Sequence, residues 1–211
     1  MIKKILKIIF PTSCTICGKI YNKWICPKCY ILLKRNLKFT TINEKNYTLY
    51  YMCFYEGAMR KLLLAFKFKE KAYIANLFVE ILKINKEFSK KIEDYDYIIS
   101  VPMHKKKQAN RGYNQTEVIA DRIEKVFRIK HLKNCLIKIK QNKKQSALNE
   151  KQRIENVKNV YKLENKNEIY NKRILLLDDI YTTGSTVKAC IDELKKGKPK
   201  IIDVLVIAKR N

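Results

Sequence analysis

Two spacings of apolar residues alternate along most of the chain. Short apolar runs, which are typical of buried strands, lie near residues 47–55, 96–101 and 173–177 and in the closing segment IIDVLVIAK. Apolar residues at helical spacing separate these runs and predict helices over 57–69, 72–88, 114–127 and about 185–196. Because strands alternate with helices, the pattern predicts an α/β fold with a mostly parallel sheet that helices cover on both faces.

The remaining segments are more polar. Asn114, with Glu117 three residues later, predicts an N-terminal cap for the helix over 114–127. The segment 138–153 is rich in Lys and Gln, so it is either a mobile hood over a ligand site or a solvated loop. Near the N-terminus a short helix and a loop precede the first strand, and we place a domain boundary between segments 1–40 and 41–211.

Four cysteines near the N-terminus form two pairs, each with two residues between the thiols. They are Cys14, Cys17, Cys26 and Cys29, and the two pairs are eight residues apart. Two such knuckles can bring four thiolates onto one tetrahedral metal ion, for which zinc is the usual occupant. Disulfides are disfavoured because the inferred compartment is reducing. A redox pair is disfavoured because such a CxxC motif would occur singly and at the start of a helix. The pattern therefore predicts a small structural zinc ribbon.

The other cysteines and the histidines offer little further chemistry. Cys53, Cys135 and Cys190 lie among apolar residues and are expected to be small core residues rather than nucleophiles. His104 and His131 are the only histidines of the chain, so a Ser-His-Asp triad or a histidine-rich metal centre has few residues to draw on.

One apolar run ends in two carboxylates, which hydroxyl residues and a glycine follow at once. The run is RILLLDDIYTTGSTVKAC, residues 173–190. In open parallel sheets, ligands bind beyond the carboxyl ends of strands, where this sequence would deliver Asp178 and Asp179. Gly184 lets backbone amides approach an anion, and the predicted helix start adds partial positive charge. The hydroxyl donors of this turn are Thr182, Thr183, Ser185 and Thr186.

Two carboxylates beside a phosphate would repel it, so they need another task. They can accept hydrogen bonds from a sugar diol, and a Mg²⁺ ion between carboxylates and phosphate would also reconcile the charges. A ribose that carries a 5-phosphate meets both conditions. The alternative is a capped helix after an acidic turn that binds no ligand.

The same stretch resembles the signature of type I phosphoribosyltransferases, whose donor is 5-phosphoribosyl 1-pyrophosphate (PRPP). The resemblance implies that Asp178 and Asp179 hold the ribose hydroxyls and that residues 182–186 hold the 5-phosphate. It also implies a pyrophosphate loop after an earlier strand, and ISVPMHKKK, residues 99–107, lies where that loop is expected. The candidate loop residues are Val101, Pro102, Met103, His104 and Lys105. Mg²⁺ is expected to bind together with PRPP.

Three further blocks resemble the ComF family of competence-associated proteins. They are YEGAMRKLLLAFKFK (55–69), RGYNQTEVIA (111–120) and QSALNEKQRIENVKNVY (145–161), with Tyr where the family often has Phe at positions 113 and 161. The family also has an N-terminal four-cysteine module directly after a segment that ends in Phe-Pro, as in IIFPTSC. The resemblance implies a zinc module, a phosphoribosyltransferase-like domain and a role in DNA uptake. Arg111, Asn114 and Gln115 are candidate contacts to a ligand or nucleic acid.

Charge and hydropathy indicate which partners and which cellular compartment to expect. The formal net charge of +26 is typical of proteins that bind polyanions, yet Lys, Ile, Asn and Tyr are all abundant, as an AT-rich genome would produce without such a ligand. No run of eighteen apolar residues occurs, and the start MIKKILKIIFP lacks the long apolar core of a secretory signal. We therefore expect a cytoplasmic protein without a transmembrane segment.

Three functions are consistent with these observations. A transferase would move a phosphoribosyl group from PRPP to an acceptor, with Asp178 and Asp179 stabilising a positively charged transition state. A nucleic-acid-binding protein would handle single-stranded DNA together with the competence machinery, with Tyr21, Trp24 and Tyr30 as stacking groups. A sensor would bind PRPP without turnover. Since every position of the 178–186 motif is present, we expect an intact donor site in a phosphoribosyltransferase-like domain.

Overall fold

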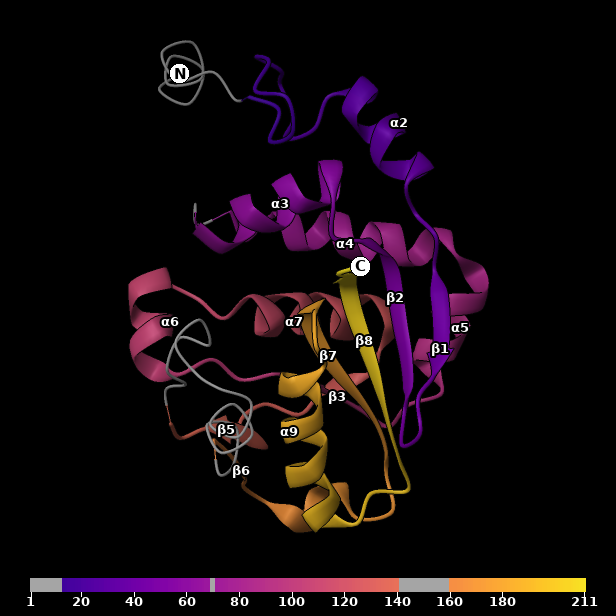
Figure 1. The fold of residues 1–211 in the computed structure, drawn as a ribbon, viewed down its shortest axis with the longest axis vertical. Helices are drawn as coiled ribbons and strands as arrows, with labels where there is room; N and C mark the ends of the chain where they lie inside the picture. The colour runs from indigo at the N-terminus through magenta and orange to yellow at the C-terminus, as the bar shows by residue number, and fades with distance from the viewer. Residues whose placement is uncertain (1–12, 69–70, 141–159) are drawn as a thin grey trace.

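The computed structural model describes residues 13–68, 71–140 and 160–211 (Figure 1). At its centre is a six-stranded sheet with the strand order β1-β2-β8-β7-β3-β4. The strands are β1 (Thr40–Asn43), β2 (Thr48–Phe54), β3 (Tyr97–Ser100), β4 (Lys130–His131), β7 (Arg173–Tyr181) and β8 (Ile201–Lys209). Within this sheet β1 and β2 pair antiparallel, and the other neighbours pair parallel. The prediction of a mostly parallel sheet is confirmed.

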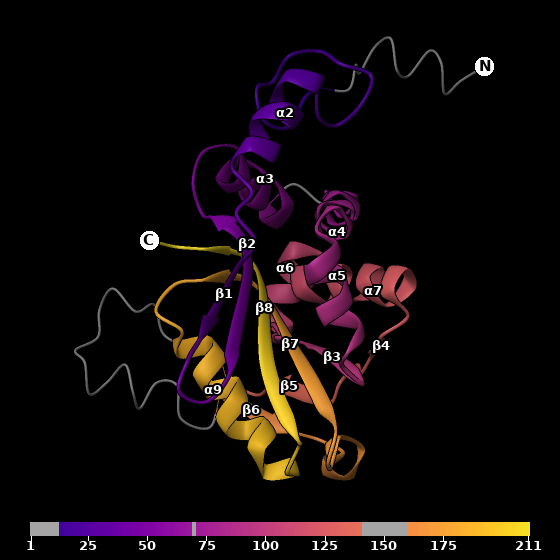
Figure 2. The same cartoon turned by 90° about the vertical axis from the view of Figure 1, so that its right-hand side faces the viewer.

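Helices cover both faces of the sheet, as the sequence predicts (Figure 2). One face carries α9 (Ser185–Leu194), next to a small antiparallel pair formed by β5 (Leu136–Lys138) and β6 (Tyr161–Leu163). The other face carries α3 (Gly57–Phe68), α4 (Ile74–Ile84), α5 (Lys86–Glu93) and α7 (Gln115–Phe127). The short helices are α6 (Lys105–Arg111) and the 3₁₀ turns η2 (Lys166–Ile169) and η3 (Lys195–Gly197).

The sheet separates two hydrophobic cores. In β7, Leu175 and Leu177 are buried in the core beneath α3, α4, α5 and α7, whereas Ile174 and Leu176 are buried in the core beneath α9. Successive side chains of a strand point to opposite faces. A strand that is covered on both sides must therefore be apolar at every position, which explains the uninterrupted run ILLL.

Several predicted boundaries need correction. The single helix predicted over 72–88 is two helices, because the backbone of Asn85 is extended and its side chain accepts the N–H of Phe88, which caps α5. The segment predicted as a loop before residue 47 contains β1. The strand predicted over 173–177 continues to Tyr181, because β8 pairs with it as far as Lys209.

Other predictions are confirmed or lie outside the described residues. Asn114 caps α7 by accepting the N–H of Thr116 at 3.3 Å. Cys53, Cys135 and Cys190 are buried core residues. Most of the predicted hood at 138–153 and of the block at 145–161 falls outside the described ranges. None of the described helices is both long and apolar enough to span a bilayer.

The N-terminal module packs against the rest of the chain. Its helix, α2 (Pro27–Arg35), begins inside the second cysteine pair. Cys14, Cys29 and Leu33 are buried in the same hydrophobic core as residues of α3 and α4. The ring of Trp24 stacks on that of Tyr73 with 3.8 Å between centroids and 20° between planes. The module therefore has a fixed attachment to the main sheet domain.

Candidate functional site

The connections that follow the neighbouring strands β7 and β3 lead to opposite sides of this strand pair. The chain leaves β7 through α9 and enters β8 on one side, and it leaves β3 through α6 and α7 and enters β4 on the other. α9 and α7 lie on opposite faces of the sheet (Figure 2). In parallel sheets such a change of direction opens a crevice at the carboxyl ends of the two strands, where ligands commonly bind. The candidate site is therefore the edge formed by the ends of β7 and β3.

The predicted acid pair lies at this edge, inside β7 rather than after its end. β3 pairs with β7 only as far as Ser100, opposite Leu177, whereas β8 accompanies β7 to Tyr181. Asp178 and Asp179 are thus the first residues of β7 beyond its last pairing with β3. The short β3 therefore does not pair with β7 beside these two carboxylates.

Asp178 is a buried carboxyl group. Its exposed fraction is 9%, and its Oδ1 accepts the backbone N–H of Asp179 at 2.8 Å. Burial, followed by the charge of Asp179, raises the pKa of Asp178 to about 7. In the free protein this carboxyl group is therefore partly protonated at neutral pH, and a ligand that donates hydrogen bonds to it would favour the charged form.

The turn after β7 has the geometry of an anion cradle. Gly184 has a φ of 74°, in the left-handed region, and directly precedes Ser185, the first residue of α9. A Cβ at position 184 would lie 2.8 Å from Cζ of Tyr181, so backbone conformation and space both require glycine. Thr183 Oγ1 donates to Ser185 Oγ at 3.0 Å. The exposed Thr182 and the half-buried Thr186 complete the hydroxyl set around the start of α9.

The predicted pyrophosphate loop follows β3 along the same edge. Its residues are Val101, Pro102, Met103, His104 and Lys105. The N–H of Val101 donates to the carbonyl of Leu177 at 2.9 Å, so the loop starts beside β7. His104 caps α6, and its Nδ1 accepts the N–H of Lys106 at 3.3 Å, which requires an unprotonated Nδ1.

A cavity of about 700 Å³ lies between this loop and β5. Its lining combines apolar side chains of β3 and β5 with charged residues of both signs, among them Lys105, Lys138 and Glu164. Neither Asp178 nor Asp179 lines it. The cavity therefore borders the candidate loop and is distinct from the space in front of the acid pair.

The four cysteines of the N-terminal module converge on one point. Their Sγ atoms all lie within 4.8 Å of one another, and those of Cys17 and Cys26 are 3.9 Å apart. A tetrahedral ion with Zn–S bonds of about 2.3 Å would hold its sulfurs about 3.8 Å apart, whereas a disulfide needs about 2 Å. All the cysteines are free, so Cys14, Cys17, Cys26 and Cys29 fit a metal ion such as zinc.

The backbone of this module favours thiolate at one position. Burial opposes ionisation of Cys14, but backbone N–H donors, that of Cys26 first, outweigh it and lower its pKa to about 6. Burial raises the pKa of Cys29. Because metal binding requires deprotonated thiols, a bound cation would supply the charge that the remaining cysteines need in order to ionise.

Comparisons with known proteins agree with this architecture. A family model described as phosphoribosyl transferase domain matches residues 115–211. Competence protein F of Haemophilus influenzae is 30% identical over 152 residues, which cover 70% of this chain and 66% of that protein. Competence protein ComFC of Bacillus subtilis is 29% identical over 198 residues, which cover 92% of this chain and 76% of that protein.

The chain belongs to the ComF family. DNA utilization protein YhgH of Escherichia coli strain K12 is a further relative, 23% identical over 188 residues that cover 82% of this chain and 80% of that protein. Among solved structures, a purine phosphoribosyltransferase from Pyrococcus horikoshii aligns with 65% of this chain and 82% of its own, with 14% identity and a TM-score of 0.38.

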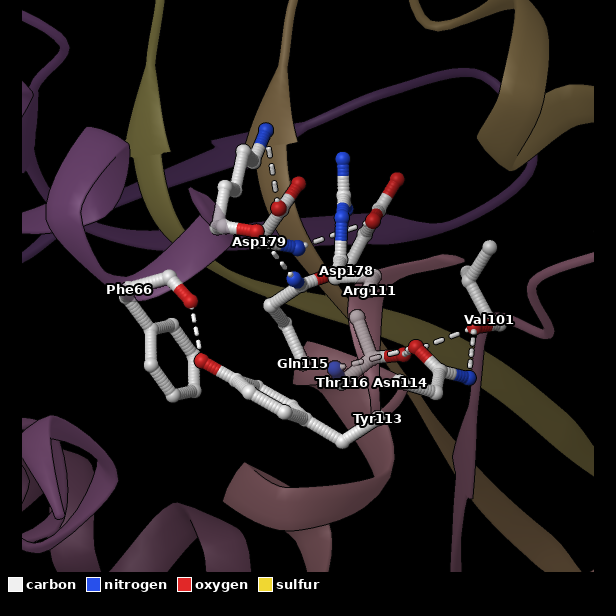
Figure 3. A network of polar contacts seen from close by, with 10 residues as sticks. Phe66, Val101, Arg111, Tyr113, Asn114, Gln115, Thr116, Asp178 and Asp179 are labelled. Atoms are coloured by element: carbon white, nitrogen blue, oxygen red, sulfur yellow. Dashed lines mark hydrogen bonds and ion pairs between the residues drawn. The ribbon is translucent and has the colours of Figure 1, made fainter. Parts of the chain in front are cut away.

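The RGYNQ motif of this ComF protein lies beside the acid pair (Figure 3). Asn114 Nδ2 and Thr116 Oγ1 both donate to the carbonyl of Val101, at 3.2 and 2.7 Å. Arg111 donates to Oε1 of Gln115 at 2.7 Å. Asn114 and Gln115 are only 2% and 1% exposed. Asn114 therefore stabilises the loop, and Gln115 stabilises Arg111, from within the protein interior. Of the three predicted contact residues, only Arg111 is not buried.

Sequence reasoning missed one charged residue of the site. Lys67, in the last turn of α3, forms an ion pair with Asp179 in which Nζ and Oδ2 are 2.9 Å apart. Its side chain is 20% exposed, and that of Asp179 is 14% exposed. In the sequence Lys67 is one lysine among many on a predicted helix, and only the packing of α3 against the sheet edge brings it to β7.

The structure also assembles a hydrogen-bonded series of Ser, His and Asp side chains that was not predicted from the sequence. Ser100 Oγ lies 3.1 Å from Nε2 of His131, whose Nδ1 lies 2.7 Å from Oδ1 of Asp121. The His131 side chain is fully buried, and Lys133 pairs with the same Asp121 oxygen at 2.9 Å. The N–H of Val101, next to Ser100, already donates to β7 and is not available as an oxyanion donor. These hydrogen bonds connect β4 to both β3 and α7.

Proposed function

We propose that this protein binds PRPP at the carboxyl ends of β7 and β3 and acts in DNA uptake for natural transformation. The observation that carries the proposal is the position of the acid pair, of which Asp178 is 9% exposed. The pair lies at a switch point of the sheet, between the turn at Gly184, whose φ is left-handed, and the loop 101–105 after β3. Asp178 and Asp179 would accept the ribose hydroxyls. Residues 182–186 would hold the 5-phosphate, and residues 101–105 would face the pyrophosphate.

The chemistry of the ligand fits these groups. A phosphate needs N–H and hydroxyl donors, which the start of α9 and its threonines supply without a lysine. A ribose diol needs acceptors, which two carboxylates supply. Mg²⁺ would bind with the pyrophosphate, since this cation prefers phosphate and carboxylate oxygens, and it would offset the negative charge of the ligand.

A transfer reaction is compatible with this arrangement. The bond between C1 of the ribose and the pyrophosphate oxygen would break, and pyrophosphate would leave with the bonding electrons. An acceptor nucleophile would then form the new bond to C1 and release its proton. The acid pair lies where it would stabilise positive charge on the ribose as the bond breaks. Release of pyrophosphate in the presence of candidate acceptors would separate turnover from binding alone.

The role in DNA uptake rests on the relatives and on charge. Three of the relatives carry names that refer to competence or DNA utilization. The net charge of +26 suits a polyanionic partner such as single-stranded DNA. The cysteine module lies beyond α3, in the direction in which β7 and β8 run (Figures 1 and 2), so a strand that extends from the module over α3 would reach the candidate site. Tyr73 stacks on the Trp24 ring, yet Trp24 is 46% exposed, so part of its surface is accessible to a base.

Titration calorimetry with PRPP at pH 8, with and without Mg²⁺, tests the binding proposal. We expect Mg²⁺-dependent binding that the double change Asp178→Asn and Asp179→Asn abolishes. Asp192→Asn, which neutralises an exposed carboxylate of α9 away from the edge, is the matched control and should bind as the unaltered protein does. Absence of PRPP binding by the unaltered protein would refute the proposal, and binding retained by the double variant would refute the site.

A further inference from the structure

The last turn of α3 is anchored to the candidate site at three consecutive residues. The Tyr113 hydroxyl donates to the carbonyl of Phe66 (Figure 3). Gln115 Nε2 donates to the carbonyl of Lys67 at 3.5 Å, and the guanidinium of Arg111 lies 5.2 Å from the centroid of the Phe68 ring. A helix end normally leaves its last carbonyls without helical partners, and here side chains of the RGYNQ motif occupy two of them.

The same motif also holds the end of β3. Asn114 of the motif and Thr116, which follows the motif directly, both donate to the carbonyl of Val101, the first residue of the candidate pyrophosphate loop. One short segment therefore fixes two parts of the site that come from distant regions of the sequence. It sets the distance between the loop after β3 and the last turn of α3.

The anchored turn presents a cation to the acid pair. Lys67 Nζ lies 2.9 Å from Oδ2 of Asp179, and both side chains are mostly buried. Asp179 also interacts electrostatically with Lys107 and Arg111 of α6. Burial and then repulsion by Arg111 and Lys67 lower the pKa of Lys107, while Asp179 acts in the opposite direction. Positive charge from α3 and α6 thus surrounds one carboxylate at the crevice.

We propose that Lys67 is a positioning residue of the PRPP site, which the RGYNQ motif holds against Asp179 so that this carboxylate stays aimed at the ribose. The inference rests on the proposed function. The ammonium group also adds positive charge next to a pair of acids that would otherwise repel an anionic ligand. A lone lysine on a solvated helix face would need neither a buried partner nor an anchored backbone.

Three variants test this role by PRPP titration in Mg²⁺ at pH 8. Lys67→Met keeps the aliphatic stem and removes the charge, and we expect its affinity for PRPP to fall about ten- to a hundredfold, the range for losing a charged hydrogen bond. Lys67→Arg keeps the charge and should recover most of that loss. Lys61→Met removes an exposed lysine of the same helix and should leave affinity unchanged.

The pH dependence of binding provides a second readout. Asp178 and Asp179 face Lys67 from α3, Lys107 and Arg111 from α6, and Lys138 from β5. The charge of Lys67 opposes the rise in the pKa of Asp178, so Lys67→Met should lose affinity on acidification at a higher pH than the unaltered protein does. A merely structural lysine would lower affinity without moving this profile.

The outcomes separate this inference from the proposed function. If the unaltered protein fails to bind PRPP, the proposed function fails. If it binds and Lys67→Met binds equally well or more tightly, the role of Lys67 is overturned while the site stands. Equal losses in Lys67→Met and Lys67→Arg would also overturn it, because charge would then not be the property that matters. Matching thermal midpoints exclude misfolding as the cause of any loss.

Discussion

At the scale of single residues, the candidate site works against the stability of the fold. Asp178 is almost completely buried, and its pKa of about 7 means that the folded protein resists the charged form. A carboxyl group in such a position is destabilising unless a ligand pairs with it. Groups with strongly shifted pKa values in crevices are frequently functional, and the location of Asp178 at a switch point of the sheet agrees with that expectation.

Asp178→Asn should therefore stabilise the free protein while it abolishes binding. In the unfolded chain the pKa of this carboxyl is near 3.8, so the folded state holds its proton more tightly between pH 4 and pH 7. The unaltered protein loses stability over that interval as pH rises, and the variant does not. We expect a free energy of unfolding roughly 1 to 3 kcal/mol higher for the variant at pH 8.

Urea denaturation of both proteins from pH 4 to pH 8 measures this difference. The advantage of the variant should grow up to about pH 7 and then level off, following the two pKa values. Asp192→Asn, at an exposed position of α9, should show no such trend. A constant difference across the range would show that Asp178 ionises in the folded protein as it does in the unfolded chain.

At the scale of elements, the turn between β7 and α9 combines a structural constraint with the proposed function. Gly184 adopts a φ of 74°, and any side chain there would meet the ring of Tyr181, whose hydroxyl lies 2.9 Å from that of Tyr47. The hydrogen bond to Tyr47 thus restrains the Tyr181 ring from moving away. The element that would bind the phosphate tolerates little change in its backbone.

Gly184→Ala should disturb both stability and binding. The left-handed conformation costs an ordinary residue about 1 to 2 kcal/mol, and the contact with Tyr181 adds to that cost. We expect a lower urea midpoint and weaker PRPP binding, because the amides at the start of α9 would shift. Lys188→Ala, on the exposed face of the same helix, is the control. Unchanged PRPP affinity in Gly184→Ala would argue against a phosphate at this turn.

The cysteine module allows a spectroscopic test at the same scale. Trp24 is the single tryptophan of the chain, and it stacks on Tyr73 of the main domain. If zinc folds the module, a strong chelator should release the metal, unstack Trp24 and shift its fluorescence to longer wavelength. The helical circular dichroism of the main domain should largely remain. Unaltered Trp24 emission after complete metal removal would contradict a structural role for the metal.

Most elements follow from the sequence because their burial leaves a periodic signal. Strands covered on both faces are continuous apolar runs, and the helices between them show an apolar stripe. β1 has no such periodic signal, because its sequence TTIN is mostly polar and it pairs only with β2 at the edge of the sheet. The break at Asn85 also leaves no such signal, because the apolar spacing continues across the two helices that Asn85 separates.

The site is predictable only where it is contiguous. The acids, glycine and hydroxyls of 178–186 are neighbours in the sequence, so their spacing alone indicates a phosphate turn. Lys67 meets Asp179 through the packing of α3, and Ser100 meets His131 through the pairing of β3 with β4. Such contacts depend on the arrangement of whole elements, for which one sequence carries no local signal.

At the scale of the whole molecule, the positive charge leads us to expect single-stranded DNA as a partner. The cysteine module lies on the side of α3 that faces away from the sheet (Figure 1), and the chain has a net charge of +26. If several lysines contact a single strand of DNA, the logarithm of the binding constant should fall linearly with the logarithm of salt concentration. Each phosphate contacted contributes a slope of roughly −0.7.

Titration of the full chain with a single-stranded oligonucleotide at several salt concentrations measures that slope. We expect a value corresponding to several phosphates, and addition of PRPP and Mg²⁺ during the titration reports whether the two ligands bind together. A slope near zero would mean that the positive charge reflects composition alone and that the proposed DNA contact does not exist.

The most direct test of the central claim is a crystal structure of the protein grown at pH 8 with PRPP and Mg²⁺. We predict the 5-phosphate on the turn 182–186, the ribose hydroxyls within hydrogen-bonding distance of Asp178 and Asp179, and the pyrophosphate beside residues 101–105. PRPP bound elsewhere on the protein, or an empty crevice at saturating PRPP, would contradict the claim.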